Sequence, residues 1–240
     1  MKENSLGDIL FLDIETVSGK AKFGDLSEEF QALWTDKTKF QRKDEVSAEE
    51  FYKERGGIMA EFSKIVCISV AFIYQSEDGL ALKTKSFFND DEQVLLSEFA
   101  ELLSHSYSKP WSRLCAHNGK EFDFPVLARR YLINKMELPL CLQLAGKKPW
   151  DIPHIDTMEL WKFGDYKHYT SLKLLCAVFG IPSPKDDIDG SMVSPTYWIE
   201  NDLPRIVKYC EKDTVSLAQV YLSMQGKDLI PQEQIYFSNL

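Results

Sequence analysis

The chain has 240 residues, 44% of them hydrophobic, which is enough for a sizeable core in a single α/β domain. Its 28 Lys and Arg against 37 Asp and Glu give a net charge of −9, which argues against duplex binding driven by counterion release. We find no signal-peptide pattern and no run of about 20 apolar residues. The five scattered cysteines form no C-x-x-C pair. We therefore expect a soluble, cytoplasmic protein with reduced cysteines and no membrane partner.

The first predicted element is a strand over residues 9–16, in which side chains alternate with a period of two. The alternation places Asp13 and Glu15 on one face. Two carboxylates this close resist joint ionisation unless a cation lies between them, and a hard divalent ion suits them. A lone Asp-x-Glu pair also fits two solvent-facing acids on an edge strand.

The next elements are helices and a hairpin. The charged stretch from about residue 18 to 63 predicts one or two surface helices in an insertion. Apolar runs at 64–74 and 80–88, separated by a short polar loop, predict two paired strands. A helical stripe then extends to Leu103, and Asn89 is its predicted N-terminal cap.

The second half of the chain alternates strands and helices, as expected of an α/β protein. In order, we predict a strand at 113–117, a helix with Asp123 at its N-terminal end, a loop at 136–153, a helix from the cap Asp156 to Phe163, a helix at 170–179, and a last helix from the cap Asp202.

Two further acids stand out in these helices. Asp213 falls inside the apolar stripe of the last helix, where a carboxylate is costly unless it is paired or binds a metal, and Tyr209 lies one turn earlier. A hydrogen bond to a core tyrosine is an alternative explanation. Asp123 lies where helix caps are common, and a cap can also support a metal.

Other chemical residues carry weaker signals. Three histidines are isolated and more often structural than catalytic, namely His117, His154 and His168. Four aromatic residues lie beside lysines and either stack bases or pack in the core, namely Trp150, Trp161, Tyr166 and Tyr169.

Taken together, the segments FLDIET, AHNGKEFDFP and YCEKD resemble the three motifs of the DEDD superfamily of 3′–5′ exonucleases. The closest resemblance is to the exonuclease domain of family B DNA polymerases, and it covers roughly residues 8–225. The Tyr209-x-x-x-Asp213 spacing resembles the tyrosine (DEDDy) branch. The resemblance implies a ribonuclease H-like α/β fold, with a mixed sheet of about five strands flanked by helices.

The resemblance also implies roles for particular residues. Asp13 would bridge two divalent cations, Mg²⁺ or Mn²⁺, with Glu15 and Asp213 completing the first site and Asp123 holding the second. Tyr209 would orient the attacking water, because its ordinary pKa near 10 makes it a poor general base. The positions that match contacts to the terminal nucleotide are Thr16, through its backbone, Asn118 and Phe122.

The function implied is that of a free-standing, metal-dependent 3′–5′ exonuclease acting on single-stranded nucleic acid, with DNA favoured. No polymerase domain follows the motifs in this chain. Residues 1–240 would form a single exonuclease domain. Two alternatives stay open: a catalytically inactive nucleic-acid-binding module of the same fold, and an RNA-directed nuclease.

Overall fold

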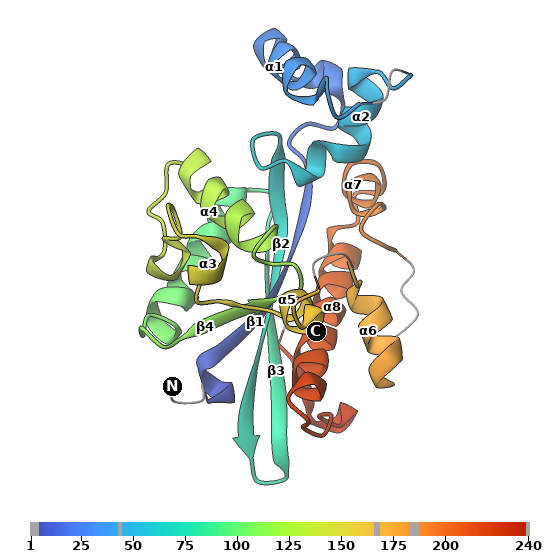
Figure 1. The fold of residues 1–240 in the computed structure, drawn as a ribbon. Helices are drawn as coiled ribbons and strands as arrows, with labels where there is room; N and C mark the ends of the chain where they lie inside the picture. The colour runs from blue at the N-terminus through green and yellow to red at the C-terminus, as the bar shows by residue number, and fades with distance from the viewer. Residues whose placement is uncertain (1–4, 43–44, 166–168, 183–187, 239–240) are drawn as a thin grey trace.

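The computed structural model describes residues 5–42, 45–165, 169–182 and 188–238. Within these residues a mixed six-stranded sheet lies between two layers of helices (Figure 1). Its strands are β1 (Ile9–Ser18), β2 (Ser63–Ser76), β3 (Gly79–Phe88), β4 (Arg113–Ala116), β5 (Ile155–Asp156) and β6 (Ile235–Phe237). Their spatial order is β5-β4-β1-β2-β3-β6. The predicted α/β fold is confirmed, and the sheet has one strand more than the expected five.

Helices cover both faces of this sheet (Figure 1). The α-helices of the described residues are α1 (Glu28–Thr38), α2 (Ala48–Arg55), α3 (Glu92–Ser106), α4 (Asp123–Ile133), α5 (Thr157–Lys162), α6 (Leu172–Phe179), α7 (Val193–Pro195) and α8 (Leu203–Met224). Helices α3 and α4 lie on one side of the sheet, and α6 and α8 lie on the other (Figure 1).

The alternation of β1 divides the core into two layers. Leu10 and its even-numbered neighbours pack in the cluster that includes residues of α3 and α4. Phe11 packs on the opposite face against α8, where its ring meets that of Tyr221 edge-on at 5.4 Å. Since side chains two apart share a face, Asp13 and Glu15 project towards α8. The strand therefore delivers both acids to the helix that carries Asp213.

The predicted hairpin is confirmed, because β2 and β3 pair antiparallel from Cys67 opposite Phe88 to Ser76 opposite Gly79. The insertion between β1 and β2 contains two helices, α1 and α2, at one end of the sheet (Figure 1). These helices share a small aromatic core in which Trp34 is fully buried.

The expected cap of α3 is wrong. Asp91, not Asn89, caps the helix by accepting a hydrogen bond from the Gln93 N–H at 2.9 Å. The Asn89 side chain instead accepts from the Asp91 N–H at 2.9 Å. Asn89 thus forms a local turn directly before Asp91, the residue that caps α3.

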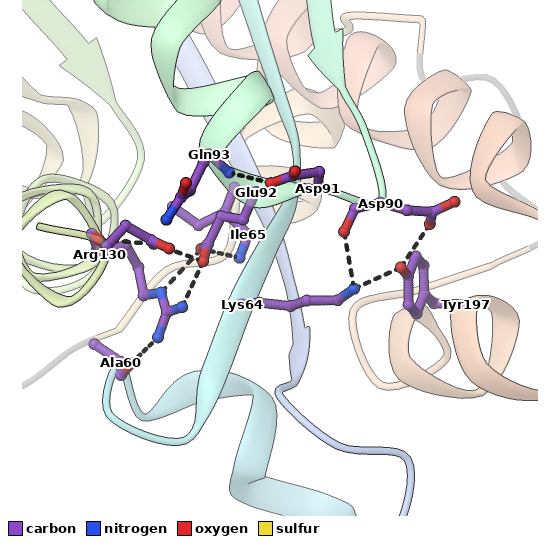
Figure 2. Close-up of polar contacts among 10 residues, drawn as sticks. Ala60, Lys64, Ile65, Asp90, Asp91, Glu92, Gln93, Arg130 and Tyr197 are labelled. Atoms are coloured by element: carbon purple, nitrogen blue, oxygen red, sulfur yellow. Dashed lines mark hydrogen bonds and ion pairs between the residues drawn. The ribbon is translucent and has the colours of Figure 1, made fainter. Parts of the chain in front are cut away.

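The residue after this cap forms a buried ion pair (Figure 2). Glu92 and Arg130 are 7% and 8% exposed, and they join α3 to α4 through charged hydrogen bonds. Glu92 also accepts from the Ile65 N–H at 2.7 Å, and Arg130 donates to the Ala60 carbonyl at 2.8 Å. The pair therefore fixes both helices to the start of β2, on the side of the sheet away from α8.

Candidate active site

The first two acids of the site lie on β1, in the part of the strand that continues past its pairing with β4. Parallel pairing between β1 and β4 runs only from Ile9 to Phe11, whereas pairing with β2 continues to Ser18. The antiparallel register shifts between Glu15 and Thr16, as at a β-bulge. Asp13 and Glu15 therefore lie on a stretch of strand whose β4-side edge is open to other groups.

Helix α8 brings a thiol to the first of these acids. Cys210 donates to the carbonyl and to the carboxylate Oδ2 of Asp13, each at 3.4 Å. Asp13, Glu15 and Cys210 each offer one possible metal-ligand atom, and these three atoms all lie within 4.8 Å of one another. Asp13 is half-buried, and the other two are buried. The sequence predicted only that Cys210 is reduced, and this contact was not predicted.

Asp123 reaches the same place from the other side of the sheet. It is the first residue of α4, and Phe122 occupies the cap position without a side-chain bond. Its carboxylate accepts a hydrogen bond from the backbone of Ile14, the residue between Asp13 and Glu15. Asp123 is therefore not the helix cap considered from the sequence, and it is tied directly to the acidic strand.

The four acids act on one another electrostatically. Burial raises the pKa of Asp13 well above its usual range, and the charges of Asp123 and Asp213 raise it further. Burial also raises the pKa of Glu15, followed by the charges of Asp13 and Asp213. Burial likewise raises the pKa of Asp123 to about 7, even though hydrogen bonds from its own backbone and that of Ile14 oppose the shift.

This donor set fits divalent cations. Closely spaced, buried carboxylates without a compensating positive charge are unfavourable in their ionised forms, and a bound cation reverses that balance. Carboxylate oxygens are the ligands preferred by hard ions such as Mg²⁺ and Mn²⁺. A hard divalent cation would therefore both compensate the negative charge of these carboxylates and find its preferred oxygen ligands there.

Tyr209 lies beside this cluster on α8. Burial raises the pKa of its hydroxyl far above the ordinary value, and the neighbouring charges of Asp213, Glu15 and Asp13 raise it further. A side-chain hydrogen bond to Asp213 acts in the same direction. The hydroxyl is therefore a hydrogen-bond donor at neutral pH and is unsuited to act as a base.

The predicted substrate residues flank the acids. Thr16 directly follows the register shift in β1, and a Cβ at Gly57 would lie 3.3 Å from its carbonyl, so the insertion returns closely over it. Asn118 adopts a left-handed conformation with φ 64°, and its N–H donates to Asp156 at 2.9 Å. Phe122 is half-buried and packs against the core beneath α4.

The loop between β4 and α4 has two supports that the sequence interpretation did not assign. Asp156, predicted only as a cap of α5, caps that helix and also accepts from the N–H groups of Asn118 and Lys120 at 2.9 and 3.0 Å. A Cβ at Gly119 would lie 2.4 Å from the Ala116 Cβ, so this position has no room for a larger residue. The loop that precedes Asp123 is therefore held in one shape.

Two of the remaining chemical residues, His117 and Trp161, have structural partners, whereas Trp150 and Tyr169 are 75% and 68% exposed and do not pack in the core. His117 bonds the Thr157 hydroxyl and the Thr170 carbonyl, whereas His168 and Tyr166 lie outside the described residues. Trp161 packs edge-on against Phe179 in the core. No described helix is long and apolar enough to cross a membrane.

The sheet order and the two helix layers define an α/β protein with a ribonuclease H-like fold. The structure is similar to that of the family B DNA polymerase from the hyperthermophilic archaeon Pyrobaculum calidifontis, with a TM-score of 0.52 and 18% sequence identity. The similarity covers 90% of this chain and 25% of the polymerase, so this chain spans about a quarter of that protein.

The family is shown by sequence. Residues 58–233 match the family of predicted 3′–5′ exonucleases related to the exonuclease domain of PolB, and the chain belongs to that family. The match begins after β1, so Asp13 and Glu15 precede it. A search of the curated proteins finds no match.

Proposed function

We propose that this protein is a metal-dependent 3′–5′ exonuclease that hydrolyses phosphodiester bonds at the 3′ end of single-stranded nucleic acid, with DNA as the favoured substrate. The observation that carries the proposal is that Asp13 of β1 lies close enough to Asp123 of α4 and Asp213 of α8 for both of their charges, after burial, to raise its pKa. Membership of a predicted exonuclease family supports the same reaction.

The four carboxylates would hold two divalent cations, Mg²⁺ or Mn²⁺. As the family resemblance implies, Asp13 would be the carboxylate shared by both ions. Glu15 and Asp213 would complete one site, and Asp123 would contribute to the other. When bound, such a pair of ions supplies Lewis-acid stabilisation and lowers the pKa of water.

The chain's own residues would position the reactants. Tyr209 keeps its proton and donates a hydrogen bond to Asp213, so its hydroxyl oxygen would orient a water beside the scissile phosphate by accepting a hydrogen bond from it. Asp123 is held by Ile14, which fixes the separation between α4 and β1. Thr16, Asn118 and Phe122 flank the acids and would contact the terminal nucleotide.

We further propose that residues 1–240 form one exonuclease domain in the DEDDy branch, with α1 and α2 as an insertion between β1 and β2. We propose that this exonuclease domain acts in the cytoplasm and without coupling to polymerisation. The buried cysteines are free thiols, as a reducing compartment allows.

The direct test is release of nucleotides from a 3′-labelled single strand with Mg²⁺ or Mn²⁺. The wild-type chain should release them, and Asp13→Asn should abolish release while keeping the folded circular-dichroism spectrum. A strand with a blocked 3′ end and a circular strand should resist cleavage. Cleavage of the circle would instead indicate an endonuclease, and binding without release would indicate an inactive binding module. Matched RNA and DNA strands would decide the sugar preference.

A further inference from the structure

A second feature lies away from the acids, in a pocket of about 290 Å³ between the segment that follows α3 and the segment that precedes β5. Three cationic side chains line it, Lys109, Arg113 and Lys147, and its lining includes no carboxylate. Residues 107–113 and 139–154 together contain four Lys or Arg and one Asp, in a chain of net charge −9. Positive charge is therefore gathered here against the average of the protein.

Two exposed tryptophans belong to the chain segments that line this pocket. Trp111 is 51% exposed and Trp150 is 75% exposed, which is unusual for the largest apolar side chain. The Lys109 ammonium lies 5.8 Å from the Trp111 ring centre, and that of Lys148 lies 5.4 Å from the Trp150 ring. Cations interleaved with aromatic faces are typical of surfaces that bind single-stranded nucleic acid, where phosphates meet the cations and bases stack on the rings.

The pocket has a rigid floor. His154 accepts a hydrogen bond from the Leu114 N–H at 3.2 Å and bonds the Cys141 carbonyl at 2.8 Å, so it joins the two walls. Both of its ring nitrogens are thereby used within the protein. The groups left to meet a ligand are the lysines of the rim, together with the part of the Arg113 guanidinium beyond Nη1, which donates to the Pro110 and Ser112 carbonyls at 2.8 and 2.9 Å.

The position of the pocket relates it to the candidate active site. Arg113 begins β4 opposite Ile9, and Asp13 lies four residues further along β1 in the parallel direction. At about 3.3 Å per residue, Asp13 lies about 13 Å beyond the position of Arg113 along the strand direction. The acids face α8, whereas Tyr107 and Cys141 of the pocket pack with the α3 and α4 cluster, so a bound strand would pass around the β5 edge of the sheet. Single-strand binding sites commonly extend over about 4–16 nucleotides, which is long enough for such a path.

We propose that this basic–aromatic surface binds the phosphodiester backbone of single-stranded nucleic acid upstream of the 3′ end that lies among the acids, with bases stacking on Trp111 and Trp150. The inference rests on the proposed function for the location of that 3′ end. It adds a second contact on the substrate, which makes recognition depend on strand length.

The test compares a long single strand with a dinucleotide, using the Lys109→Ala/Lys147→Ala double variant, a Trp111→Ala variant and Lys227→Ala. Lys227 is an exposed lysine in the turn after α8 and serves as the matched charge control. For the long strand the double variant should raise KM and leave kcat unchanged. Each phosphate contact contributes about 0.7 to the slope of log KM against log salt concentration, so the loss of two lysines should reduce that slope by about 1.4. Trp111→Ala should raise KM at least about fivefold. All variants should hydrolyse the dinucleotide as the wild type does.

Binding is measured independently of turnover by fluorescence anisotropy of a labelled long strand in EDTA, with the same expected loss of affinity and slope. If the wild type hydrolyses nothing, the proposed function fails, and the anisotropy still decides whether the surface binds a strand. An unchanged slope in the double variant, an equal loss in Lys227→Ala, or equal losses on the long strand and the dinucleotide would each overturn the inference. If the surface binds pyrophosphate but does not bind the strand, the inference is overturned as well.

Discussion

The carboxylate of Asp123 accepts a hydrogen bond from the backbone N–H of Ile14, the residue that separates Asp13 from Glu15. This contact joins α4 to an open part of the edge of β1, so the acid of the second motif is fixed to the strand of the first. The carboxylate thus has a structural partner as well as a proposed metal.

Replacing Asp123 should separate these two functions. Asp123→Asn keeps an oxygen that accepts from Ile14 and removes a buried charge, so in EDTA it should unfold at a urea concentration equal to or above that of the wild type. Its hydrolysis should fall at least a hundredfold. Asp123→Ala leaves the Ile14 N–H without its partner and should cost about 1–3 kcal/mol. Equal stability of the Ala and Asn variants would show that the hydrogen bond contributes nothing.

The Cys210 thiol makes a second testable contact with the acids. It donates to Asp13 at 3.4 Å, and loss of a hydrogen bond of about 1 kcal/mol corresponds to about a fivefold change in affinity. Cys210→Ala should therefore raise the dissociation constant for Mn²⁺ about fivefold, and Cys210→Ser should restore it. Calorimetric titration provides the measurement. If the Ser and Ala variants bind Mn²⁺ equally, the thiol does not position Asp13.

The ion pair between Glu92 and Arg130 makes a prediction about stability (Figure 2). Arg130→Met leaves Glu92 buried without its cation and should destabilise the protein by about 3–5 kcal/mol in urea unfolding. Arg129→Met, an exposed neighbour on the same helix, is the control and should change stability by less than about 0.5 kcal/mol. A double variant that also carries Glu92→Met should recover most of the loss, whereas additive losses would contradict a coupled pair.

His154 predicts a pH dependence of stability. Burial is the main cause that lowers its pKa, from 6.5 to about 4, and the nearby charge of Arg113 acts in the same direction. Because the unfolded state takes up the proton first, stability should be complete above about pH 6.5 and fall by about 3 kcal/mol towards pH 4. His154→Gln should flatten this part of the profile in urea unfolding at a series of pH values. An unchanged acid slope would assign it to other groups.

The sequence predicted what depends on local pattern. The alternation in β1 placed Asp13 and Glu15 on one face, and Asp202 caps α8 as expected. It did not predict β6, because a strand of three residues forms only through its pairing with β3. The contact of Cys210 with Asp13 joins positions 197 apart, so no local signal distinguished that thiol from an ordinary core residue.

The same distinction applies to the acids. Their residue types and spacing led to a metal site, but the bond from Ile14 to Asp123 arises because β4 stops pairing at Phe11, which only the folded sheet reveals. Likewise the predicted cap, Asn89, and the observed cap, Asp91, are both residue types that suit a helix start, and only the folded chain shows that Asn89 bonds the Asp91 N–H instead.

Calorimetric titration of Mn²⁺ into the metal-free protein tests most directly whether the acids form one metal centre. The wild-type chain should bind two ions, and Asp13→Asn, which removes the bridging carboxylate, should lose at least one of them while remaining folded. Asp36→Asn, an exposed acid of α1, should bind as the wild type does. Two ions bound with unchanged affinity by Asp13→Asn would contradict the account.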